Sequence, residues 1–182
     1  MKVMDTALPG VKILEPAVFG DDRGFFFELW NRTRHGDAGL PDEFVQDNVS
    51  RSGHGTLRGL HYQYPTLQGK LVTVLFGSIF DVVVDIRRGS PHFGQWVGVA
   101  LSDSDRRQIW APRGFAHGFV VTSDRADVLY KVDDAYRPDE AFAIAWDDPA
   151  LAIDWPVLPT TLSDKDRTAP RLADAATLPI WP

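Results

Sequence analysis

Short runs of β-branched and aromatic residues recur along the whole chain, and this pattern constrains the fold more than any other feature. The runs include KLVTVLF, IFDVVVDI, QWVGVAL, GFVV and ADVLYKV, and clusters of Gly, Pro, Asp and Ser separate them. No window of ten or more residues has the periodicity of an amphipathic helix. Many short strands at this spacing predict an all-β sandwich, jelly roll or small barrel, and a jelly roll with an interior pocket is our first choice.

The layout of the chain suggests one domain with a distinct tail. A length of 182 residues favours a single domain over residues 1–182 with a core of its own. Gly77-Ser78 lies between two strand-forming runs and predicts a hairpin, and a second pair of strands is expected around Gly20-Asp21-Asp22. The tail after Thr161 has Pro, Asp and Thr in place of periodicity, so we expect it to wrap the surface or cover the mouth of a barrel.

The charge balance and the cysteine count narrow the class of protein. The net charge is −6 and the isoelectric point is about 5.3, which argues against nucleic-acid and membrane-surface partners. A few local arginines could still hold an anionic ligand. The chain has 0 cysteines, which excludes disulfides and thiolate metal sites, and no apolar segment reaches the ~20 residues of a membrane span. We therefore expect a soluble, cytoplasmic protein.

Two of the five histidines lie beside glycine in β-rich settings, His61 in RGLHYQ and His117 in PRGFAHGF. The second stretch resembles the Pro-x-Gly-x-x-His half-motif of the cupins, a jelly-roll class. The first half-motif of metal-binding cupins needs His-x-His and a later Glu. Here Gln63 stands at the second histidine position, and Leu67 and Gln68 stand near the expected Glu. At most two ligands remain, which is too few for a firm metal site, so we expect a cupin-type jelly roll with no metal and no other cofactor.

Further motifs extend this resemblance to one family of metal-free cupins. In chain order they are RGFFFELWN, FVQDNVSRS, TLRGLHYQ, QGKLVTV, PRGFAHGF, VLYKVDDAYRPDEA and LSDKDRTAP. Their order and spacing resemble the dTDP-4-dehydrorhamnose 3,5-epimerases, and the resemblance runs from about Gly10 to Pro170. It implies inversion of C3 and C5 of dTDP-4-dehydro-6-deoxy-D-glucose through an enolate. The product would be dTDP-4-dehydro-L-rhamnose, in dTDP-L-rhamnose biosynthesis.

The resemblance also implies four catalytic residues. The protons on C3 and C5 both flank the C4 ketone, so the reaction needs a base, a group that stabilises the enolate oxygen, and an acid on the opposite face. His61 corresponds to the base, and Asp166 corresponds to the carboxylate that fixes the imidazole tautomer. Lys70 corresponds to the lysine near C4, and Tyr130 to the proton donor on the other face. Asp164 is only two residues away, but Asp166 aligns with the Lys-Asp pair of the family motif.

A site for a nucleoside diphosphate, shared between two chains, is implied as well. Arg23 and Arg58 correspond to arginines near the diphosphate and the sugar, and Phe26 and Tyr136 could sandwich the base. The other positions contact the nucleotide or lie close to the sugar, and they are Glu28, Gln46, Asn48, His117 and Glu140. Some N-terminal contacts come from a partner subunit in this family, which implies a homodimer with exchanged N-terminal strands.

Without the resemblance, several of these residues have ordinary structural explanations. His117 fits a satisfied core histidine as well as a pocket residue. Gln46 and Asn48 alternate on one strand face, so both could point to solvent. Asp81 and Asp85 are four residues apart and share a strand face, and for them barrel-edge structure is favoured over a two-carboxylate site.

Three other functions stay open at the level of sequence. A mono-functional 3- or 5-epimerase of a related dTDP-4-keto-6-deoxyhexose would have the same catalytic residues. A non-catalytic sugar-nucleotide-binding cupin would bind dTDP without proton exchange, and the intact set of His61, Lys70, Tyr130 and Asp166 weighs against it. A metal-dependent cupin oxygenase would need stoichiometric metal.

Overall fold

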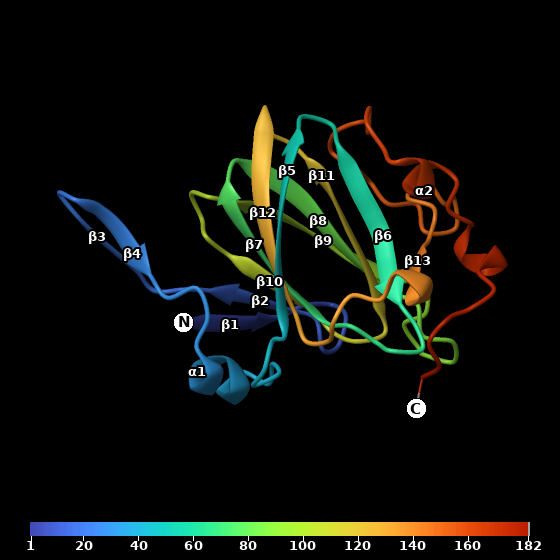
Figure 1. Cartoon of the computed structure of the whole chain (residues 1–182), viewed down its shortest axis with the longest axis horizontal. Helices are drawn as coiled ribbons and strands as arrows, with labels where there is room; N and C mark the ends of the chain where they lie inside the picture. Colours follow the sequence, from blue (N-terminus) through green and yellow to red (C-terminus); the bar gives the residue numbers. More distant parts are fainter. Residues whose placement is uncertain (182) are drawn as a thin grey trace.

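The computed structural model describes residues 1–181, and most of their strands form two antiparallel sheets (Figure 1). The first sheet has the order β1 (Lys2–Asp5), β2 (Lys12–Glu15), β10 (Gln108–Ala111), β7 (Lys70–Phe76), β12 (Arg125–Val132) and β5 (Gln46–Gly53). The second has the order β13 (Ala141–Ala143), β6 (Leu57–Gln63), β11 (Phe115–Val121), β8 (Ser78–Asp85) and β9 (Trp96–Ser102). The predicted all-β jelly roll is confirmed.

Helices are few and short. They are α1 (Arg32–Asp37), α2 (Asp164–Arg167) and the 3-10 turns η1 (Pro138–Glu140) and η2 (Leu172–Asp174). Over residues 1–181, no helix has both the length and the apolar character needed to cross a bilayer.

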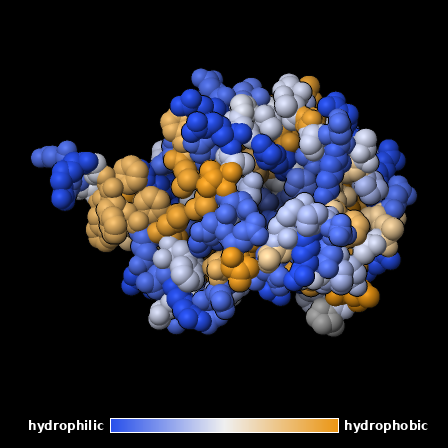
Figure 2. Space-filling model, in the orientation of Figure 1, coloured by the Kyte–Doolittle hydropathy of each residue, from blue (hydrophilic) through white to orange (hydrophobic). Residues whose placement is uncertain are grey.

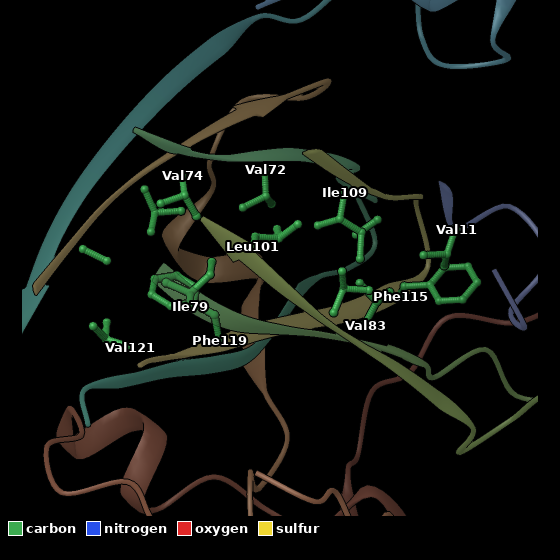
Figure 3. Close-up of a cluster of buried hydrophobic side chains, with 14 of the residues drawn as sticks. Val11, Val72, Val74, Ile79, Val83, Leu101, Ile109, Phe115, Phe119 and Val121 are labelled. Atoms are coloured by element: carbon green, nitrogen blue, oxygen red, sulfur yellow. The ribbon is translucent and has the colours of Figure 1, made fainter. Parts of the chain in front are cut away.

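The main hydrophobic core lies between the two sheets. Figure 3 shows Val72 and Ile109, from the first sheet, pointing toward Ile79, Val83 and Phe119 of the second. Each of these side chains is at most 2% exposed. Because side chains alternate across a strand, every second residue of these strands enters the core, and each buried apolar side chain contributes about 1.5–3 kcal/mol to folding.

The C-terminal tail packs on the outer face of the second sheet. Leu172 and Leu178 join a second buried cluster with Val82 and Val84 of β8. The Tyr62 hydroxyl of β6 donates a hydrogen bond to the Thr177 carbonyl oxygen at 2.7 Å. This packing fixes α2 beside β6, where it bears on the site described below.

The predicted hairpin at Gly77-Ser78 is wrong. β7 pairs with β10 and β12, whereas β8 pairs with β9 and β11, so the chain crosses from one sheet to the other at this point. Gly77 has a φ of +77°, and a Cβ there would collide with the Arg125 carbonyl oxygen. A left-handed glycine makes the tight crossing possible, and the same glycine signal is typical of a hairpin turn.

A third pair of strands, β3 (Val18–Asp21) and β4 (Gly24–Phe27), forms a hairpin that projects from the body (Figure 1). We call this hairpin the arm. It contains Phe19, Phe25 and Phe26, which are 66%, 61% and 70% exposed, and Figure 2 shows apolar surface along the arm with hydrophilic residues at its tip. A lone two-stranded hairpin is marginally stable in water, and aromatic surface of this extent marks an interaction site.

Candidate active site

A cavity of about 740 Å³ opens between the two sheets. All four predicted catalytic residues line it, His61, Lys70, Tyr130 and Asp166. The predicted binding residues Gln46, Asn48, Arg58, His117 and Tyr136 line it too. Strands β5, β7 and β12 of the first sheet and β6 and β11 of the second supply most of these side chains. A cavity of this size is typical of small-molecule sites.

His61 and Asp166 form a short hydrogen-bonded pair in the cavity. His61 Nε2 lies 2.5 Å from Asp166 Oδ1, and the Asp166 side chain is only 3% exposed. Asp166 is placed by α2, because the side chain of the N-cap residue Ser163 accepts a hydrogen bond from the Asp166 backbone N–H at 3.1 Å. Since a carboxylate accepts the proton on Nε2, Nδ1 is left free as a base.

The charge state of Asp166 follows from its surroundings. Burial alone would raise the pKa of this carboxyl, but the hydrogen bond from His61, with further ones from Ser163 and the Gly59 N–H, holds the pKa below its usual value. Asp166 is therefore a carboxylate near neutral pH, and it would stabilise an imidazolium that forms on His61.

Tyr130 enters the cavity from the sheet opposite to His61. It lies on β12, in register with Asn48 of β5 and Val72 of β7, whereas His61 lies on β6 of the second sheet. A ligand held between the sheets would thus have an imidazole on one side and a phenol on the other.

Lys70 is the first residue of β7, at the edge of the cavity. Burial lowers the pKa of Lys70 to about 8, against the opposing effect of the Asp133 and Asp81 carboxylates. An ammonium with this pKa is mostly charged at pH 7 and gives up its proton readily.

His117 and Asp81 form a second histidine–aspartate pair. His117 Nε2 lies 2.8 Å from Asp81 Oδ2, and Asp81 is fully buried. The expectation that Asp81 belongs to barrel-edge structure is wrong, because it points between the sheets on the same face of β8 as Ile79 and Val83. Burial raises the pKa of Asp81, although the charges of His117 and Lys70 act in the opposite direction.

Polar side chains on β5 face the cavity rather than solvent. Gln46 Nε2 donates to Asn48 Oδ1 at 2.8 Å, and Gln46 Oε1 accepts from the Tyr136 backbone N–H at 3.0 Å. Ser52, which also faces inward on β5, accepts a hydrogen bond from Arg58 Nε at 3.0 Å. This end of the cavity therefore offers several hydrogen-bond donors and acceptors to a ligand.

The other predicted binding residues do not line the cavity of their own chain. Arg23 is paired with Asp21 at the tip of the arm, and Phe26 is exposed on the arm. Glu28 accepts from Arg34 Nε at 2.7 Å. The last of the set, Glu140, accepts from the Thr66 backbone N–H at 3.1 Å.

Lys165 also lies in the site and was not predicted from the sequence. It lines the cavity from α2, and its Nζ donates to the Ala141 carbonyl oxygen at 2.8 Å. The signal was available, because Lys165 stands in the same LSDKDRTAP motif as Asp166. Over residues 1–181, no group of three or more His, Asp or Glu side chains is placed to hold a metal ion.

Comparison with known proteins adds family and structural relatives. The family model described as dTDP-4-dehydrorhamnose 3,5-epimerase matches residues 5–174. The dTDP-4-dehydrorhamnose 3,5-epimerase of Pseudomonas aeruginosa is 55% identical over 181 residues, which cover 98% of this chain and 100% of that protein.

Solved structures agree over the whole fold. The 3,5-epimerase of Legionella pneumophila, solved with dTDP-4-keto-L-rhamnose, is 52% identical with a TM-score of 0.96, covering 100% of this chain and 98% of that one. A 3'-monoepimerase of Streptomyces bikiniensis, solved with dTDP-quinovose, is 33% identical with a TM-score of 0.91, covering 96% and 91%.

Proposed function

The chain belongs to the dTDP-4-dehydrorhamnose 3,5-epimerase family and is an epimerase of a dTDP-linked 4-keto-6-deoxy sugar, and we propose how its own residues invert the two carbons. The observation that supports the scheme best is the placement of the His61–Asp166 pair and Tyr130 on opposite sheets around one cavity. Inversion requires that a proton leave one face of a carbon and return to the other.

His61 removes the proton in this scheme. The C3 and C5 protons flank the C4 ketone, so loss of either one gives the same type of enolate. Nδ1 of His61 accepts the proton while Asp166 holds Nε2–H and stabilises the imidazolium. One base can serve both carbons in turn, because they lie on either side of the same ketone.

Lys70 stabilises the enolate oxygen, and Tyr130 returns the proton. An ammonium that burial has made more acidic donates a strong hydrogen bond to an oxygen as negative charge develops there. The Tyr130 phenol then protonates the carbon from the opposite face. After each inversion His61 releases its proton to solvent and Tyr130 takes one up, which restores both groups for the next turnover. The scheme uses only imidazole, ammonium and phenol, so it needs no metal and no other cofactor.

The nucleotide is held from two chains in this proposal. Gln46, Asn48 and Tyr136 bind the thymine end, and Arg58 supplies charge for the diphosphate. His117, Glu140, Arg23, Phe26 and Glu28 complete the predicted binding set, and we assign the last three to the cavity of a partner subunit. A homodimer with exchanged arms is supported by the exposed phenylalanines of the arm and by exposed Val49, Leu75 and Phe76 on the first sheet.

We further propose that residues 1–182 act as one domain, with the C-terminal tail as a cover over the outer face of the second sheet. We also propose that the protein works in the cytoplasm. The cysteine count of 0 fits a reducing compartment.

The direct test follows the protons of the substrate. In deuterated buffer, proton NMR should show loss of both the C3 and C5 signals of dTDP-4-keto-6-deoxyglucose, and a His61→Ala variant should lose exchange at both carbons. No exchange above a no-enzyme control, together with dTDP binding, would indicate a non-catalytic sugar-nucleotide-binding cupin.

A mono-functional epimerase is the second candidate, because the 3'-monoepimerase of S. bikiniensis has the same fold. The higher identity to 3,5-epimerases favours the bifunctional enzyme. Exchange at only one carbon would assign the mono-functional activity.

A further inference from the structure

One arginine from the body of the protein contacts the arm through the phenylalanine rings of β4. Arg106 lies between β9 and β10, and its guanidinium carbon is 3.6 Å from the centroid of the Phe25 ring and 5.8 Å from that of Phe27. The two rings are themselves stacked, with centroids 6.1 Å apart. A planar guanidinium over an aromatic face at this separation is a cation–π contact.

The guanidinium is held rigidly toward the arm. Arg106 Nη1 donates to the Asp103 and Ser104 carbonyl oxygens at 2.7 Å and 3.2 Å, so the side chain is fixed against its own loop. Its Nε is buried and has no hydrogen-bond partner. The loop is tied to the sheet crossing, because Asp103 Oδ2 accepts from the Gly77 N–H at 2.7 Å.

The backbone of Arg106 also has an uncommon conformation. Its φ is 55°, in the left-handed region that non-glycine residues rarely adopt. A bulky residue persists there only where its surroundings hold it, and such positions concentrate at functional sites. The strained backbone and the ring contact are two independent observations at one residue.

The contact with Arg106 determines which face of the arm stays available to a partner. In the β3–β4 register Phe19 pairs with Phe26, and Gly20 pairs with Phe25. Directly paired residues share a face of an antiparallel hairpin, and neighbours along a strand lie on opposite faces. Arg106 therefore contacts the face that carries Phe25 and Phe27, while Phe19 and Phe26 lie on the opposite face.

We infer that Arg106 is a positioning residue that sets the direction and facing of the arm, so that Phe26 and Arg23 reach the cavity of a second copy of this chain. This inference rests on the proposed exchange of arms. β3 and β4 pair only with each other among the strands of residues 1–181, so the ladder hydrogen bonds do not fix the arm against the body. Arg106 supplies that fixed contact from outside the active site.

The test compares Arg106→Asn with the wild-type dimer. Asparagine tolerates the left-handed backbone, so the substitution removes the cation and its two Nη1 hydrogen bonds without straining the backbone. We expect KM for the dTDP-4-keto-6-deoxy sugar and the dimer dissociation constant to rise by about three- to tenfold, the loss of one cation–π contact. The kcat should stay close to wild type, because no group that touches the reacting atoms has changed.

Three variants make the result specific. Arg107→Gln is the matched control in the same loop, where Arg107 Nη2 donates to the Ala100 carbonyl oxygen, and it should behave as wild type. Arg106→Lys keeps the charge and should restore part of the affinity. Phe25→Leu removes the aromatic partner of the same cation–π contact. The double variant Phe25→Leu/Arg106→Asn should raise KM no further than either change alone.

Phe26→Ala separates this inference from the exchange of arms. A rise in KM for Phe26→Ala with an unchanged KM for Arg106→Asn would overturn the role of Arg106 and leave the exchange standing. An unchanged KM for Phe26→Ala, or a monomeric wild-type enzyme, would overturn the exchange and this inference with it. A fall in kcat with unchanged KM in Arg106→Asn would also contradict a positioning role.

Discussion

His61 and His117 are direct partners in the register between β6 and β11, and each has an aspartate of its own. His61 Nε2 is 2.5 Å from Asp166, which α2 supplies, and His117 Nε2 is 2.8 Å from Asp81, which β8 supplies. The surroundings lower the pKa of Asp166 and raise that of Asp81. The surroundings thus favour the charged form of Asp166 and disfavour that of Asp81, and we assign the base to the pair whose carboxylate is favoured.

Replacing Asp166 by asparagine should lower kcat far more than it weakens binding. The amide is close in shape, but it carries no charge and its NH2 group can donate to Nε2 of His61, so the imidazole loses both its counter-charge and the tautomer that leaves Nδ1 free. We expect kcat to fall roughly 10³- to 10⁴-fold, as for other histidine–aspartate pairs. Steady-state kinetics would measure the fall in kcat, and deuterium exchange at C3 and C5 would measure the loss of proton removal.

Asp164→Asn is the matched control for this change. Asp164 lies on the same helical turn, and only its backbone carbonyl is used, as the acceptor for Thr168. It should leave kcat close to wild type. If the two variants had equal activity, Asp166 would not be the partner of the base.

Local patterns in the sequence predicted the strands well, and they failed where the answer depended on distant residues. The alternation in IFDVVVDI identified β8, but the glycine before it fits a hairpin and a crossing between sheets equally well. Which one forms is decided by where β12 lies, some fifty residues later.

The site shows the same division between local and distant information. The resemblance supplied Asp166 as the partner of His61, although 105 positions separate them and spacing alone could not have paired them. Asp81 was misplaced because alternation assigns a residue to a face without saying which face is inward. The two strands of the arm were predicted, but the contact between the arm and Arg106 was not, because Arg106 lies in a loop about eighty residues later in the chain.

The pH profile of kcat should have a basic limb set by Lys70. Burial lowers the pKa of Lys70 to about 8, and the proposed role needs the ammonium, so kcat should fall as pH rises through this value, by about tenfold per pH unit beyond it. Lys70→Gln should lower kcat and remove the limb. A wild-type kcat that stays constant up to pH 10 would contradict the role of the ammonium.

The buried ammonium of Lys70 should also lower the free energy of unfolding at neutral pH. Its folded-state pKa of about 8 lies below the ordinary value of 10.5, so between these values the unfolded chain binds more protons and wild-type stability rises with pH. Lys70→Met lacks this titration. We expect the variant to have the higher Tm at pH 7, with the difference shrinking toward pH 10, and differential scanning calorimetry would measure it. A difference that grew with pH would contradict the depressed pKa.

The crossing at Gly77 should tolerate no side chain. Gly77→Ala places a Cβ against the Arg125 carbonyl oxygen at a φ of +77°, so we expect a loss of about 1–3 kcal/mol in the free energy of unfolding. Gly36→Ala is the control, since a Cβ there meets no atom within 4 Å and α1 is helical. It should equal or exceed wild-type stability. Urea denaturation would measure both, and equal stabilities would argue against the crowded crossing.

Tyr130→Phe should separate proton removal from proton return. Because His61 lies on β6 and Tyr130 on β12, the variant keeps the base and loses only the donor on the opposite face. Deuterium should still enter C3 and C5 at a rate close to wild type, while inverted product forms about 10²-fold or more slowly. Proton NMR in deuterated buffer gives the exchange rate, and the coupling constants of the sugar ring give the configuration. Parallel loss of exchange and inversion would mean that Tyr130 acts in the first step, and the assignment of opposite faces to base and acid would have to be reversed.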